Sequence, residues 1–142
     1  SQYFDNRNYQ IDMHSLANSA LFNFPNNLSF SINFEMIYKQ NQTGVEKSNQ
    51  YNAEATLDYR IKEKGSLSVK MQYVNILFNG TNDNSLGYEM LGGLSIGNNY
   101  LWNVAYQTKL FDYLQINLQY EGRLTQDNTV IHVGFLQLKA YF

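Results

Sequence analysis

The chain of 142 residues has no cysteine and a single proline, and its apolar residues form no long run. Without cysteine, the chain has neither a disulfide framework nor a thiolate metal site. No stretch approaches the roughly 18–20 consecutive apolar residues of a membrane helix. No apolar stripe recurs at helical spacing, so no amphipathic helix is expected. With Pro25 as the only proline, long extended segments are predicted.

Charged residues are also few, at 15% of the chain, with a formal net charge of −2. The basic residues are scattered and give no nucleic-acid footprint, so no nucleic-acid partner is expected. Aromatic residues are abundant instead, with twelve tyrosines and nine phenylalanines. Aromatic side chains favour strands, so the composition indicates an all-β protein.

Period two dominates the sequence. From Leu28 to Tyr38 and from Tyr51 to Ile61, apolar residues alternate with serine, asparagine, threonine and charged residues. This alternation predicts antiparallel strands with one apolar and one polar face. Further strands are expected at 67–78, with a bulge within 74–78, and at 102–110, 114–121 and 130–142. The segment from Arg7 to Phe24 is expected to be a strand with a defect near Ser15 and Leu16.

The connections between these strands alternate in length. Short turns are expected at 25–27, 63–65 and 111–112, with Gly65 supplying the positive φ of its hairpin. Longer loops are expected near 42–50, 79–99 and 124–128. In outer-membrane barrels the short turns are periplasmic and the long loops are external. The alternation holds if residues 86–97 stay in a loop, which favours seven spanning strands, leaves eight open, and places the C-terminus in the periplasm.

The length of the expected strands and the charged residues on their polar face favour strands that cross a bilayer over strands packed in a soluble core. The expected strands have about 10–13 residues, against 9–11 needed to cross a bilayer and five or six in soluble sheets. The predicted fold is an antiparallel transmembrane β-barrel segment covering residues 1–142. The charged residues predicted to face its lumen are Glu54, Asp58, Arg60, Lys62, Lys70, Lys109, Glu121, Arg123 and Lys139. The aromatic residues predicted at the membrane interfaces are Tyr38, Tyr51, Tyr59, Trp102 and Tyr120.

The last 55 residues or so resemble a known family. The stretches Tyr113–Arg123, Val130–His132 and Gln137–Phe142, and the glycine-rich 92–102, are similar to the C-terminal region of large Bacteroidota outer-membrane barrel proteins. The alternating last strand closed by Phe142 resembles the β-signal of such proteins. The resemblance implies a bacterial outer-membrane location, the barrel assembly machinery as a partner, and an assembly signal at Leu136, Leu138, Ala140 and Phe142.

Known proteins of this kind are longer, and seven is an odd number of strands, so further strands or other subunits are expected to complete the barrel. The absence of an initiator methionine and of a leader at Ser1 indicates a mature form or a fragment. The expected role is a structural, transport or secretion component in contact with outer-membrane lipid.

Two other functions stay open on the sequence alone. One is a soluble surface sheet that binds glycan or protein through its tyrosines. The other is a lipid hydrolase at the barrel rim, which needs a serine beside a histidine. Ser15 lies on the opposite strand face from His14, and His132 has no serine in sequence reach, so no enzyme activity is expected. No cofactor or metal is expected either, and Asp83 is interpreted as part of a polar loop rather than a calcium site.

Overall fold

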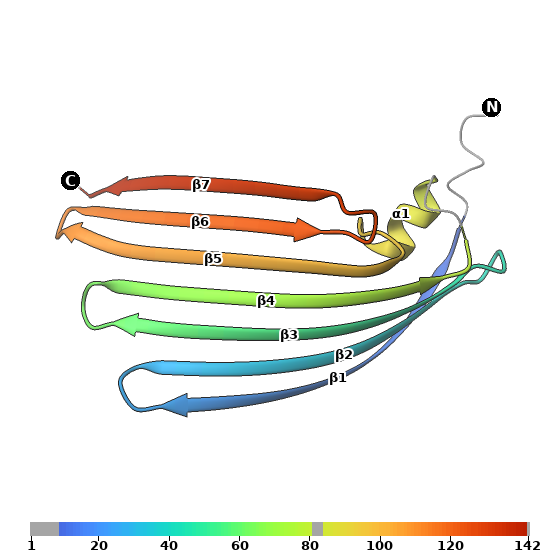
Figure 1. Ribbon diagram of the computed structural model, residues 1–142, viewed down its shortest axis with the longest axis horizontal. Helices are drawn as coiled ribbons and strands as arrows, with labels where there is room; N and C mark the ends of the chain where they lie inside the picture. Colours follow the sequence, from blue (N-terminus) through green and yellow to red (C-terminus); the bar gives the residue numbers. More distant parts are fainter. Residues whose placement is uncertain (1–8, 81–83, 142) are drawn as a thin grey trace.

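The computed structural model describes residues 9–80 and 84–141. Within them the chain is all-β, with seven strands in one antiparallel sheet whose order follows the sequence (Figure 1). The strands are β1 (Ile11–Phe24), β2 (Leu28–Asn41), β3 (Lys47–Ile61), β4 (Gly65–Phe78), β5 (Gly97–Phe111), β6 (Leu114–Leu124) and β7 (Val130–Ala140). The antiparallel sheet predicted from the period-two pattern is therefore confirmed. Arg7, Asp83 and Phe142 lie outside the described residues.

The two ends of the sheet differ. Three tight turns, at 25–27, 62–64 and 112–113, lie at one end together with the end of β7 (Figure 1). The connections 42–46, 79–96 and 125–129 lie at the other end. The first two are a few residues shorter than expected, because β3 begins at Lys47 and β5 at Gly97.

The prediction for the β3–β4 hairpin was wrong about its glycine. Glu63 adopts the left-handed conformation, with φ of 59°, and Gly65 is the first residue of β4. Gly65 is needed for another reason, because a Cβ there would overlap the backbone carbonyl of Gln107 on β5. The glycine therefore allows β4 and β5 to approach each other closely, and it is not needed for the conformation of the turn.

Two expected irregularities are also absent. β1 pairs with β2 without a register shift from Ile11 to Phe24, so the defect predicted near Ser15 and Leu16 was wrong. β4 pairs continuously with β3 from Gly65 to Phe78, so the bulge predicted within 74–78 was wrong as well. In both strands the apolar residues change face while the backbone stays regular. The register shift that the structure does contain lies between Lys109 and Phe111, where β5 meets β6.

Between β4 and β5 the chain forms a short helix, α1 (Ser85–Leu91), so no strand spans 86–97. The Asn84 side chain caps its first turn by accepting a hydrogen bond from the Gly87 amide at 2.7 Å. Gly92, with φ of 61°, ends it in the left-handed conformation. Its buried residues Gly87, Met90 and Leu91 recur at helical spacing, so the prediction that the chain has no amphipathic helix was wrong.

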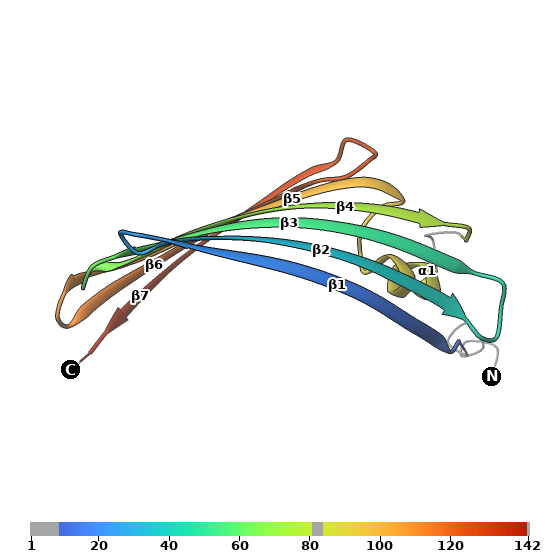
Figure 2. The same ribbon diagram turned by 90° about the horizontal axis from the view of Figure 1, so that it is seen from below.

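The core of the molecule lies between α1 and one face of the sheet. Val74, Ile76 and Leu91 form its buried centre, with Phe78, Leu94, Ile96 and Leu101 packed around them. The sheet is bent, and α1 lies on the inner side of the bend (Figure 2). We call the face that α1 covers, which also carries Glu54 and Lys70, the concave face, and the opposite face the convex face. Val74, Ile76 and Phe78 turn toward the concave face because α1 buries them there.

Candidate functional site

The concave face is lined by amide and carboxylate side chains that pair across neighbouring strands. The Asn33 amide on β2 donates to Glu54 on β3 at 3.1 Å, and the Asn52 amide on β3 donates to Glu35 on β2 at 3.1 Å. The Asn103 amide on β5 donates to Glu121 on β6 at 3.0 Å. In each contact a side-chain amide, rather than a cation, donates the hydrogen bond to a carboxylate oxygen. The face therefore presents a hydrogen-bonding surface that suits water or polar solutes.

One ion pair is formed among the residues that the structure describes. Lys70 Nζ on β4 lies 3.4 Å from Glu54 Oε2 on β3, with the lysine side chain 46% exposed. An ion pair this exposed contributes about 0–1 kcal/mol to stability. It fixes the position of Glu54 more than it stabilises the fold.

The charged residues predicted to face a lumen almost all share the concave face. The strand pairing places eight of the nine on that face: Glu54, Asp58, Arg60, Lys70, Lys109, Glu121, Arg123 and Lys139. Lys62 lies in the β3–β4 turn instead, because β3 ends at Ile61. The structure brings Glu54 and Lys70 together, and it directs Arg123 to the α1 segment, where its Nη1 donates to the Gly93 carbonyl at 3.4 Å.

Sequence reasoning missed the residues that hold α1 on the concave face. Lys39 Nζ on β2 donates to the carbonyls of Glu89 and Met90, at 3.1 and 3.3 Å, near the C-terminal end of the helix. There a cation is favourable, because the helix dipole leaves partial negative charge on the last carbonyls. The fully buried Asn99 donates to the carbonyl of Ser95 at 2.8 Å and accepts from the Ser95 amide at 3.1 Å. The available signals were Asn84 and Gly92 as helix caps and the apolar residues on both faces of β4.

The convex face is apolar across the strands and remains uncovered in this chain. The five aromatic residues predicted at membrane interfaces, Tyr38, Tyr51, Tyr59, Trp102 and Tyr120, all lie on it. So do Leu136, Leu138 and Ala140 of the predicted assembly signal, on the edge strand β7. Its exposed large residues also include Leu16, Phe22, Phe34, Met36, Leu57, Met71, Tyr73, Tyr100 and Leu118. A contiguous apolar surface of this kind marks a contact with lipid or with another protein.

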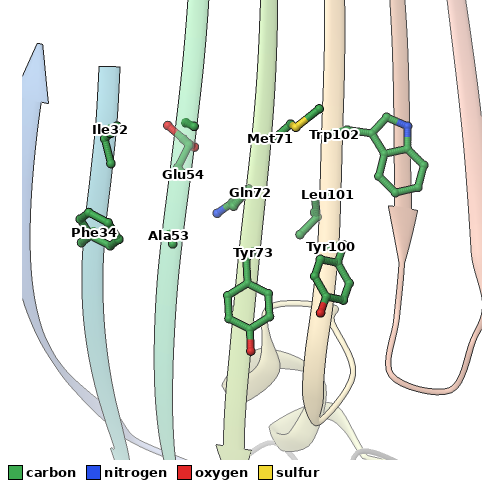
Figure 3. A pocket seen from close by; sticks show the side chains of 11 residues that line it. Ile32, Phe34, Ala53, Glu54, Met71, Gln72, Tyr73, Tyr100, Leu101 and Trp102 are labelled. Atoms are coloured by element: carbon green, nitrogen blue, oxygen red, sulfur yellow. The ribbon is translucent and has the colours of Figure 1, made fainter. Parts of the chain in front are cut away.

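A shallow groove of about 490 Å³ runs across the middle of the convex face. The small residues Ala53 and Ala55 of β3 line it, and Figure 3 shows Ala53 between larger side chains on the neighbouring strands β2 and β4. Tyr73 and Tyr100 form one wall on adjacent strands, with ring centroids 5.3 Å apart. The groove is lined almost entirely by apolar atoms.

No family model, curated protein or solved structure matches the chain. Among the described residues, no helix is long and apolar enough to cross a membrane. The two faces of the sheet are therefore the features from which a function is inferred.

His132 belongs to an aromatic cluster on the convex face. Its Nδ1 lies 2.7 Å from the Tyr120 hydroxyl, and its ring stacks on Tyr120 and contacts Trp102, with both centroid distances at 5.9 Å. The polar partner of this histidine is thus a tyrosine of β6. His14 and Ser15 occupy successive positions of β1 and point to opposite faces. No group of three or more metal-ligating side chains occurs in the part of the chain that the structure describes.

Trp102 lies over Gly122, and this contact gives a first prediction. A Cβ at Gly122 would overlap the indole ring, whereas a Cβ at Gly134 on the same face would meet nothing within 4 Å. We expect Gly122→Ala to displace the indole and lower the free energy of unfolding by about 1–3 kcal/mol. Because Trp102 is the only tryptophan, its fluorescence reports the displacement directly. Gly134→Ala is the matched control, and equal emission spectra for both variants would contradict this contact.

The 125–129 connection gives a pH-dependent prediction. The hydroxyl of Thr125 donates to the Asp127 carboxylate, and that of Thr129 donates at 3.1 Å. These hydrogen bonds, that of Thr125 most of all, lower the pKa of Asp127 below its usual value. Because the folded pKa is lowered, the contribution is present above the unfolded pKa and is lost as pH falls through the folded one.

We therefore expect the turn to open in acid. The Asn128 amide, which donates to the Thr125 carbonyl at 2.9 Å, should lose protection against exchange, relative to the intrinsic rate at the same pH, once Asp127 is protonated. NMR titration of the carboxyl carbon and amide exchange measure the two effects. Asp127→Asn should abolish the pH dependence of this protection factor, and a protection factor that is equal at all pH values in the unmodified chain would show the carboxylate to be unimportant.

Proposed function

We propose that this chain forms part of the wall of a bacterial outer-membrane β-barrel of the transport or secretion type. The observation that carries the proposal is the division of the sheet into two faces. Large apolar side chains stand exposed on the convex face, while the charged residues of the strands gather on the concave face. A soluble sheet of this curvature would need a partner over its convex face. A barrel wall needs lipid there and water inside.

The dimensions of the convex face also support a barrel wall in a membrane. The strands have 11 to 15 residues, enough to cross a bilayer when tilted. On β3 the tyrosines at 51 and 59 bracket an apolar stretch of alanines and leucine on this face. Eight residues at about 3.3 Å each, tilted by about 40°, span roughly 20 Å of membrane thickness. The apolar band of such barrels is about 25 Å tall, with aromatic girdles at both borders.

The two ends of the sheet give an orientation. We place the tight turns and the end of β7 in the periplasm, and α1 with the longer connections at the outer surface, as in other outer-membrane barrels. The alternating apolar residues of β7, Leu136, Leu138 and Ala140, are then available to the barrel assembly machinery on a free sheet edge. The concave face, with its amides and paired charges, lines the aqueous side.

Refolding of residues 1–142 tests this proposal. We expect aggregation in plain buffer, because the exposed convex face needs an apolar environment, and β-sheet circular dichroism in detergent micelles, with the two edge strands still open. A folded, monodisperse monomer in buffer would contradict the membrane proposal and favour the soluble binding sheet. The variant Met71→Lys, described in the Discussion, tests the same face without relying on solubility.

A further inference from the structure

Among the residues that the structure describes, neither edge of the sheet has a partner strand. β1 pairs only with β2, and β7 pairs only with β6, so each presents a row of free backbone N–H and C=O groups. In hydrocarbon each unsatisfied backbone group costs several kcal/mol, which is why membrane sheets close on themselves. If the chain is a barrel wall, as proposed above, further strands must cover both edges.

The direction of the two edge strands restricts what can cover them. With seven strands all antiparallel, β1 and β7 run the same way, both starting at the end that carries α1 (Figure 1). Direct closure would therefore pair β1 with β7 in parallel. A second copy in the same membrane orientation would also bring its β1 against β7 in parallel. An antiparallel wall needs an odd number of additional strands between the two edges.

The position of α1 sets a lower limit on that number. The helix packs through Leu91 against Val74 and Ile76, inside the curve of the sheet (Figure 2). Its opposite side is open, and Tyr88 there is 67% exposed. A helix with its side chains is about 10–12 Å wide, whereas an eight-stranded barrel is just wide enough for its own side chains. One additional strand therefore leaves no room for α1.

We propose that the sheet is completed by an odd number of at least three further strands, antiparallel to both β1 and β7, in a wall of ten or more. The concave face becomes apolar along part of β7, at Ile131, Val133 and Phe135, whereas on β1 Ser15, Ala17 and Ser19 lie between Met13 and Leu21. The strand that adjoins β7 should therefore carry apolar residues toward the inside next to these three positions, as well as toward lipid.

The test adds strands to the N-terminus of the whole chain, each extension joined through a copy of the 125–129 loop. One chain receives a copy of β6, a second a copy of β5–β6, and a third a copy of β4–β5–β6 with 79–96 replaced by a glycine–serine linker. In each extension the copied β6 runs antiparallel to β1, and the earlier copied strands alternate in direction from there. Heat-modifiable gel mobility in detergent and hydrogen exchange of the outward amides of β1 and β7 report closure.

We expect the three-strand extension to close as a monomer, and the two-strand extension and the unextended chain to keep rapidly exchanging edges. The one-strand extension should close only when its own 79–96 segment is also replaced by the linker. Closure of the unextended or two-strand chain, or edges that stay unprotected in the three-strand chain, would overturn the strand parity. Closure of the one-strand chain with α1 present would overturn the size limit. Folding of all these chains in plain buffer would instead refute the barrel proposal itself.

Discussion

Replacing Met71 by lysine is expected to lower the free energy of unfolding in lipid by about 2–4 kcal/mol, the cost of a cation at the lipid-facing midplane of a barrel. Met71 lies in the middle of β4 on the convex face and is 64% exposed in this chain. A residue this exposed on a soluble protein tolerates lysine with a change within about 0.5 kcal/mol. The size of the effect therefore reports the medium that contacts the convex face.

The adjacent residue provides the matched control. Gln72 points to the concave face and pairs in register with Glu54, so Gln72→Lys places the same charge beside a carboxylate. We expect that variant to change stability by less than about 1 kcal/mol. Urea titration of both variants in lipid vesicles, followed by Trp102 fluorescence, measures the difference. Equal effects at the two positions would show that the two faces of the sheet meet the same solvent.

Leu91→Ala is expected to release α1 from the sheet. Leu91 is 1% exposed and packs on Val74 and Ile76, which are themselves almost fully buried. Loss of a buried leucine costs about 2–5 kcal/mol, and this cost falls on a seven-residue helix whose other buried residues are Gly87 and Met90. Because the strands remain paired by their backbone, we expect the helix to open locally while the circular dichroism of the sheet is retained.

Amide exchange of Leu94, whose N–H donates to the Leu91 carbonyl at 3.3 Å, measures this opening. A loss of 2–5 kcal/mol corresponds to faster exchange by about 30-fold or more, up to the rate of an open segment. Tyr88→Ala is the control, since it removes a large side chain from the exposed side of the same helix. Equal protection in both variants would mean that the core under α1 does not hold the segment in place.

The division of the strands into faces was readable from the sequence because it depends on neighbouring residues alone. In an extended chain successive side chains point to opposite sides, so the alternation from Leu28 to Tyr38 and from Tyr51 to Ile61 already separates the two faces. The same local logic found the strands and the turn at 25–27. It also found that 86–97 does not cross the sheet, since the connection lengths alternate only without it.

The errors arose where distant residues decide the local structure. Val74, Ile76 and Phe78 suggested a bulge because nothing nearby in the sequence explains apolar residues on the polar face; α1 explains them once it is folded over the strand. The helix itself is only seven residues long, so its apolar spacing covers about one turn, and it depends on Lys39 and Asn99 from other strands. Gly65 was assigned to the wrong role because its close neighbour, Gln107, lies on the next strand.

The sequence by itself thus determined the secondary structure class, the strand faces and the placement of apolar and charged residues, all of which follow from the period-two geometry of a strand. Only the tertiary structure decided the register between strands, the pairing of Glu54 with Lys70, the direction of the bend and the packing of α1 inside it. These depend on which distant side chains meet, and burial of Ile76 and Leu91 under α1 is favourable only once β4 and the helix are brought together.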